Sequence, residues 1–141
     1  MLFRSVDRVE VLGRAHEVAA RRALALRHDA RTAAAAVAAL GPHATGEALA
    51  LAEVARDHLE GAREAGAITA TAGDRWQLTQ GSMATALLDA LAPSARIELL
   101  RRVAAALDRS GAPATARCEA WTRAGDVSRA LVLLQIGRAH V

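Results

Sequence analysis

The chain has 141 residues, with 18 basic residues against 15 acidic ones and a formal net charge of +3. About half of its residues are hydrophobic, every basic residue is Arg, and Ala is the most frequent residue. A disordered, a collagen-like and a disulfide-stapled chain are excluded, because the composition supplies a core and contains a single Cys. Since Ala and Arg favour helices, we expect one mainly α domain, or two very small ones.

Both ends of the chain differ from its middle. Residues 1–5 and 136–141 are similar to the translated strands of a common sequencing adaptor, and the last six residues break the helical pattern before them. We therefore expect residues 6–134 to be an internal piece of a longer protein. A net charge of +3 would suggest an anionic partner. Without Arg4 and Arg138, and with no acidic residue lost, the net charge is +1, which no longer indicates such a partner.

Nothing in the remaining segment predicts a membrane protein. The longest apolar run is far shorter than the roughly 20 residues that a spanning helix needs. The single Cys118 fits a reducing compartment, so we expect a cytoplasmic protein.

The first half of the chain predicts three helices in sequence. Residues 6–28 are expected to be a linker or weak helix from an upstream domain. Asp29 and Thr45 are suitable N-caps, and Gly41 with Pro42 ends a helix sharply. The expected helices cover residues 30–40, 46–54 and 55–64.

The spacing of the apolar residues then changes from the helical period to every second residue. Ile68 lies on one side of a turn at Gly73, and Trp76 and Leu78 lie on the other, a pattern typical of a short antiparallel hairpin. Because such a hairpin is not stable alone, we expect these residues to pack against the third helix, which carries Leu59. Three helices followed by a hairpin is the order of a winged helix, which we predict for residues 29–80.

Residues 81–135 are expected to form a helical region. A short helix ends at Pro93, and a longer one follows with Ser94 as its N-cap and Gly111 at its end. The expected buried stripe of the longer helix consists of Ile97, Leu100, Val103, Ala104 and Leu107.

Two further helices form a tight hairpin. They are expected at residues 114–124 and 127–134, with Asp126 as the cap of the second. Trp121 is expected to fill the groove beside Ala130 and Leu131. This unit resembles one tetratricopeptide-like (TPR-like) repeat, although no second copy follows at a fixed period.

Candidate chemical motifs do not hold together. The segment from Gly41 to Gly46 has the glycine spacing of a phosphate loop, but Glu47 and Ala48 replace the Lys and Ser/Thr that the motif needs. Cys118 has no base nearby in sequence, so we interpret it as a small buried hydrophobe.

The remaining titratable residues are read as surface groups. Four of the five histidines lack ligand spacing to a Cys or carboxylate, and two helical carboxylates are expected to face water. These are His16, His28, His43 and His58, with Glu60 and Glu64. We therefore predict no catalytic, cofactor-binding or metal-binding residue and no enzyme activity for this chain.

DNA binding is an alternative from a different class, because winged helices often read the major groove. The outward face of the third helix carries three acids and two arginines, and phosphate attraction dominates DNA affinity. We expect that face to pack against protein. A free-standing DNA-binding protein would need the arginines of residues 14–31 to form one basic surface together with the outward face of the third helix. The face consists of Arg56, Asp57, His58, Glu60, Arg63 and Glu64.

Two sequence runs carry a family resemblance. Residues 59–68 (LEGAREAGAI) and 73–79 (GDRWQLT) are similar to a winged-helix segment of large bacterial regulators, the multidomain signal-transduction ATPases of the LuxR type. The likeness extends over about residues 31–134, with further matches at 86–91, 95–107, 119–121, 124–126 and 129–131.

The resemblance implies a regulatory role without chemistry. Such regulators carry ATPase, winged-helix and helical-repeat regions before a DNA-binding terminus, so ATP is expected only in a missing upstream domain. This segment would couple that ATPase to a helical sensor array by protein–protein packing. The implied partners are other domains of the same protein and a regulatory protein or small-molecule effector, without direct DNA or membrane binding. A helical adaptor module of another multidomain enzyme is the remaining alternative.

Overall fold

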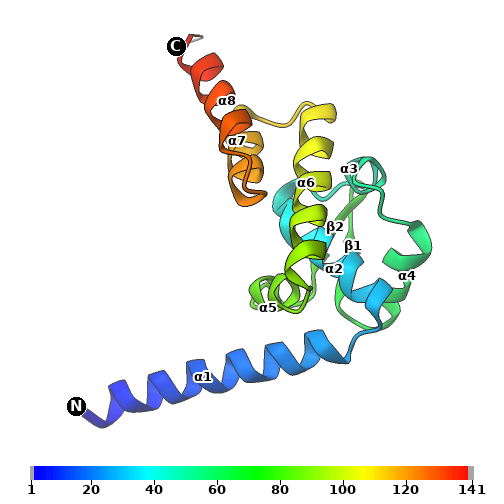
Figure 1. The fold of residues 1–141 in the computed structure, drawn as a ribbon. Helices are drawn as coiled ribbons and strands as arrows, with labels where there is room; N and C mark the ends of the chain where they lie inside the picture. The colour runs from blue at the N-terminus through cyan, green and yellow to red at the C-terminus, as the bar shows by residue number, and fades with distance from the viewer. Residues whose placement is uncertain (1, 140–141) are drawn as a thin grey trace.

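The computed structural model describes residues 2–139, which fold into a mainly helical structure with one small antiparallel sheet. This confirms the expected mainly α class. One long helix projects from the body at the N-terminal end, and a helical hairpin stands at the opposite end (Figure 1). Between them, the two strands lie against α2 (His28–Leu40) and α4 (Arg56–Glu64), with their outer residues exposed. No helix among the described residues is both long and apolar enough to cross a membrane.

The N-terminal segment is one continuous helix, α1 (Leu2–Ala25). It begins at Leu2, within the first five residues, which resemble translated sequencing adaptor. Met1 lies outside the described residues. It packs against α5 (Met83–Asp89) through small side chains, of which Ala19 and Ala23 are buried. The expectation of a weak helix or linker at residues 6–28 therefore understated the length of this helix.

The end of α1 is held by a residue of the next helix, α2 (His28–Leu40). The Arg31 guanidinium donates hydrogen bonds to three carbonyl oxygens at the α1 C-terminus: Ala23 O at 3.0 Å, Leu24 O at 2.8 Å and Leu26 O at 2.9 Å. Carbonyls at a helix end lack partners within the helix, so Arg31 acts as a C-terminal cap supplied by a neighbouring helix. The corner between α1 and α2 is thereby fixed.

Helix α2 lies at the centre of the fold. It contacts α4, α5, α6 and β2, and its buried face is made chiefly of alanines. The prediction that Asp29 caps it was wrong: the helix begins at His28, and Arg27 occupies the N-cap position without a side-chain hydrogen bond. Asp29 instead lies in the first turn, where a carboxylate interacts favourably with the helix dipole.

Two short helices follow a 3₁₀ turn, η1 (Gly41–His43). Helix α3 (Gly46–Leu51) has the predicted cap, because Thr45 Oγ1 accepts a hydrogen bond from Ala48 N at 3.1 Å. It is shorter than predicted, since the chain turns sharply at Glu53, whose φ is +63°. Helix α4 (Arg56–Glu64) agrees with its predicted range.

The hairpin consists of β1 (Ile68–Thr71) and β2 (Arg75–Leu78), paired from Ile68 with Leu78 to Thr71 with Arg75. Strand β1 lies against α4 as expected, whereas β2 lies against α2 and η1.

The chain before α3 adds a third extended piece to the sheet. Thr45 forms a bridge to Arg75, with Trp76 N donating to Ala44 O at 2.8 Å and Gly46 N donating to Asp74 O at 3.0 Å. The start of α3 is thereby tied to the hairpin.

Helix α6 (Pro93–Arg109) begins with its proline in the first turn, so the predicted N-cap at Ser94 was wrong. Its core face differs from the expected stripe at Ile97. Ile97 is 43% exposed, and the neighbouring Leu99 is buried in its place. The other residues of that stripe are buried: Leu100, Val103, Ala104 and Leu107.

The last two helices, α7 (Ala114–Arg123) and α8 (Val127–Ala139), form the predicted hairpin. Asp126 caps α8 as expected, since its Oδ1 accepts a hydrogen bond from Arg129 N at 3.1 Å. Helix α8 continues to Ala139, so the expected break after residue 135 does not occur within the described residues; residues 140 and 141 lie outside them. Leu131 is 53% exposed, and Leu133 is the leucine of α8 that is buried.

The Arg31 cap generates a stability prediction. We expect Arg31→Met to lower the free energy of unfolding by about 1–2 kcal/mol, because three carbonyls lose a charged donor. Arg31→Lys keeps the charge but not the planar fork, so it recovers only part of the loss. Urea unfolding and amide hydrogen exchange of residues 20–26 measure both effects.

The matched control is Arg21→Met, at an exposed position of α1, which we expect to change stability by less than about 0.5 kcal/mol. Equal losses for Arg31→Met and Arg21→Met would contradict the capping role.

Candidate functional site

A polar cluster around Trp121 joins the last three helices. Asp108, near the end of α6, accepts hydrogen bonds from Arg117 Nε at 2.7 Å and Trp121 Nε1 at 3.0 Å. From α8, the Arg129 guanidinium carbon lies 4.3 Å from the centre of the Trp121 ring, and its Nε lies 3.5 Å from Asp126 Oδ2. These charge-assisted bonds and the cation–π contact set the position of the α7–α8 hairpin on α6.

An apolar hollow of about 370 Å³ opens beside this cluster. Its apolar wall contains Trp121, Leu133 and the half-exposed Val132 and Ile136. The apolar lining is the kind of surface on which a further helix or peptide can pack.

The outer side of α8 carries a second apolar stripe. Val127, Leu131 and Leu134 follow one another at helical spacing, and each exposes about half of its surface. Among the side chains described on α8, the one charged group is Arg129, and it is turned toward Trp121. We call the three residues the α8 stripe. It has the spacing of the core-facing stripe of a helix, yet nothing in the described chain covers it.

Helix α1 is the other element with exposed large apolar side chains. Val11, Val18 and Leu24 are exposed, although Ala19 and Ala23 on the same helix are buried. Arg14, Arg21 and Arg22 add positive charge to the exposed part. With Ile97 on α6, these residues and those of α8 make up the exposed large hydrophobic side chains of the described chain.

The outward face of α4 contains one internal ion pair and further exposed groups of both signs. Arg63 Nη2 lies 2.7 Å from Glu60 Oε2, one helical turn away. Asp29 of α2 lies 3.5 Å from His58 Nε2. Arg56, Asp57 and Glu64 are exposed, so the face presents both signs of charge, as its sequence predicted.

The motifs that resembled chemical sites do not form one. The Gly41–Gly46 segment folds into η1 and the capped start of α3, which accounts for its glycines. Cys118 is half-buried with Sγ 3.6 Å from Ala130 O. Among the side chains that the structure describes, no three His, Cys, Asp or Glu residues gather where a metal ion could bind.

The large residues expected to form the core are mostly buried. Leu59, Ile68, Trp76 and Trp121 are buried, and Leu78 is half-buried against the core. Asp108 was not singled out from the sequence. The four-residue spacing of Arg117 and Trp121 places both on one face of α7, but it does not identify the acceptor that they share.

Comparison of the chain with protein-family models, with curated proteins and with solved structures gave no match.

The cluster predicts a measurable loss. We expect Asp108→Ala to lower the free energy of unfolding by about 1–2 kcal/mol, because the Trp121 and Arg117 donors lose a shared charged acceptor. Asp89→Ala is the matched control: its carboxylate is 66% exposed and lies 3.7 Å from Arg96, so we expect a change below about 0.5 kcal/mol.

In a Trp76→Phe background, indole fluorescence reports on Trp121 alone, and urea unfolding followed at this signal measures both variants. A loss for Asp108→Ala no larger than that for Asp89→Ala would show that the cluster does not hold the hairpin.

Proposed function

We propose that this chain is the non-catalytic regulatory segment of an ATP-dependent transcriptional regulator of the LuxR type. In this proposal, a winged helix at residues 29–80 and the start of a helical-repeat region at residues 81–135 couple an ATPase domain to a helical sensor array. The coupling acts through protein–protein packing. The observation that carries the proposal is the placement of uncovered apolar side chains on α1 and α8, at the two ends of the body (Figure 1).

The order of elements in the first half supports the winged-helix assignment. Helix α2 is followed by the short extended piece at Thr45, by α3 and α4, and then by β1 and β2. The bridge from Thr45 to Arg75 makes the extended piece a third member of the small sheet. A helix, a short strand, two helices and a hairpin is the arrangement expected of a winged helix.

The charge of α4 favours protein packing over DNA binding. In a DNA-reading winged helix this helix would enter the major groove, and phosphate contacts would supply most of the affinity. Here the Glu60–Arg63 pair removes one of its two positive charges, and Asp57 and Glu64 remain exposed. An insertion of this face would bring carboxylates toward phosphates.

The α8 stripe supports a neighbour on the C-terminal side. Helical repeats bury their outer apolar faces by stacking, so a single hairpin leaves one face uncovered. The α7–α8 hairpin has such a face, and the Asp108–Trp121 cluster gives it a fixed position on α6. An adjoining helix on the stripe would transmit its displacement to α6, and through α6 to α2.

The stripe gives a contrast between neighbouring leucines. We expect the double variant Leu131→Glu/Leu134→Glu to change the free energy of unfolding by less than about 0.5 kcal/mol, because both side chains are already exposed. Leu133→Glu, one residue away and 7% exposed, is expected to cost more than about 3 kcal/mol, since it buries a charge. Urea unfolding of the full chain measures both; a large loss in the double variant would show that the stripe serves this chain's own core.

A DNA titration tests the rival function. Fluorescence anisotropy of a labelled duplex is measured against the full chain at two salt concentrations. We expect no salt-dependent binding at protein concentrations up to about 10⁻⁴ M, the weak end of ordinary non-specific affinity. The variant Glu60→Gln/Glu64→Gln leaves the α4 arginines unopposed by these acids and is expected to gain measurable, salt-sensitive binding. Binding by the unaltered chain that weakens steeply with salt would contradict the proposal.

A further inference from the structure

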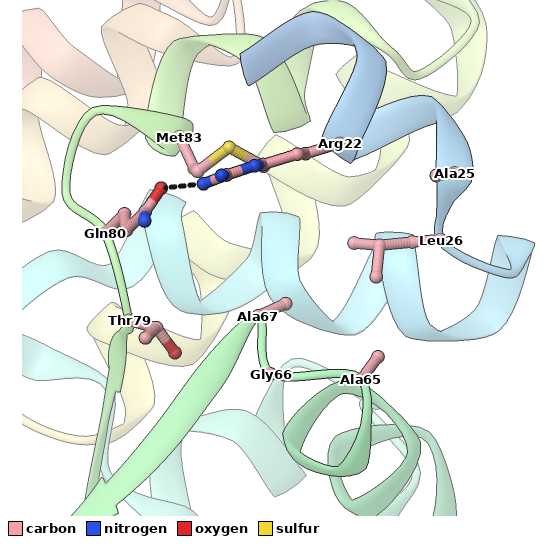
Figure 2. Close-up of a pocket in the computed structure, with 9 residues that line it drawn as sticks. All are labelled: Arg22, Ala25, Leu26, Ala65, Gly66, Ala67, Thr79, Gln80 and Met83. Carbon is pink, nitrogen blue, oxygen red and sulfur yellow. Dashed lines mark hydrogen bonds between the residues drawn. The ribbon is translucent and has the colours of Figure 1, made fainter. Parts of the chain in front are cut away.

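A cleft of about 440 Å³ lies where α1 passes over the base of the hairpin. It is bounded by the end of α1, by the turn between α4 and β1, and by the loop between β2 and α5 (Figure 2). Its volume is within the range of small-molecule sites. None of the residues that serve the proposed packing of α4 or α8 lines it.

The cleft has a polar end and an apolar end. Figure 2 shows the Arg22 side chain reaching over the cleft to Gln80, with Met83 beside it, and Arg22 Nη1 donates to Gln80 Oε1 at 2.7 Å. Leu26 and Ala65 lie toward the opposite end in the same view. The lining therefore changes from hydrogen-bonding to apolar along its length.

The charge at the polar end is positive and is not balanced by an acid of the cleft. Arg22 is the one charged residue in the lining, and no carboxylate belongs to it. On the other side of the Arg22–Gln80 contact, a smaller hollow is lined by Arg14 and Ser82, again without an acid. Arg14 lines that hollow and not the cleft, so the cation of the cleft is Arg22, whose planar guanidinium matches a carboxylate.

We propose that this cleft binds a small amphipathic monocarboxylate, whose carboxylate displaces Gln80 Oε1 from the Arg22 guanidinium and whose hydrocarbon chain lies toward Leu26 and Ala65. Arg22 donates to the carboxylate oxygens, and the Gln80 amide NH₂ supplies a second donor. The hydrocarbon chain removes apolar wall from water, which a phosphate or another compact anion does not do.

Binding at this place also acts on α1. The ligand bridges Arg22 of α1 and Gln80 of the loop after β2, two positions now joined by one exposed hydrogen bond. A bridged α1 is held more firmly over the hairpin base. This use of the ligand as an effector rests on the proposed function, whereas the binding itself does not.

Octanoate is the probe, and amide chemical shifts of the full chain are the readout. We expect saturable shifts at Gly66, Ala67 and Thr79, and at least tenfold weaker binding of octanol, which has the same chain length without the charge. Equal binding of octanol and octanoate, or no saturable shift at these amides, overturns the proposal.

Three variants separate the site from the fold. Gln80→Glu keeps the size of the side chain and pairs Arg22 with an internal carboxylate, so we expect at least a tenfold loss of octanoate affinity. Amide hydrogen exchange on α1 is expected to stay unchanged, which would show that α1 remains packed on the body. Arg22→Met is expected to lose at least tenfold, whereas Arg21→Met, on the same helix outside the cleft, stays within twofold. Equal affinities for the Arg22 and Arg21 variants overturn the assignment. None of these results depends on the DNA titration, so the two proposals fail independently.

Discussion

The fold depends on how closely its elements can approach helix α2. Four consecutive alanines, Ala33 to Ala36, are almost completely buried, and the helix contacts α4, α5, α6 and β2. A small side chain buries little area, but it lets the neighbouring backbones approach, so dispersion contacts across the gap are gained. The larger buried residues then have to fit around that centre. Leu40, Leu49, Ile68, Leu87 and Leu99 fill it with almost no exposed surface.

The elements at the two ends are attached to this centre by polar contacts as well as by packing. Helix α1 is positioned by the Arg31 cap and by small-residue contacts with α5, and the α7–α8 hairpin is positioned by Asp108. Both elements expose large apolar side chains. Under the proposed function, each of these two elements would contact a neighbouring domain through its exposed apolar side chains. The cleft beneath Arg22 lies at the end of α1, between α1 and the base of the β-hairpin.

Local signals were enough to predict most elements. Thr45 and Asp126 cap the helices that their sequence positions indicated, and Gly41, Gly73 and Gly111 take positive φ at the helix ends and the turn where they were expected. The change of period from helix to strand identified both strands of the hairpin. Each of these features depends on residues that are close in sequence.

Two caps predicted from local sequence, Asp29 and Ser94, were each placed two residues too late. The other errors arise where a distant residue decides the outcome. The end of α1 depends on Arg31, a cap supplied by the following helix, and the hairpin position depends on Asp108. Ile97 and Leu131 belong to crowded apolar runs that allow more than one buried stripe, and only the neighbouring helices select between them. The cleft beneath Arg22 likewise joins three segments that lie far apart in the sequence.

The central claim is that α1 and α8 are covered by neighbouring domains of a longer chain. Its direct test is amide hydrogen exchange on this chain alone and on this chain within the longer protein that the proposal requires. The account predicts at least tenfold slower exchange on α1 and α8 in the longer chain, with exchange on β1 and β2 little changed. Equal exchange on α1 and α8 in the two proteins would contradict it.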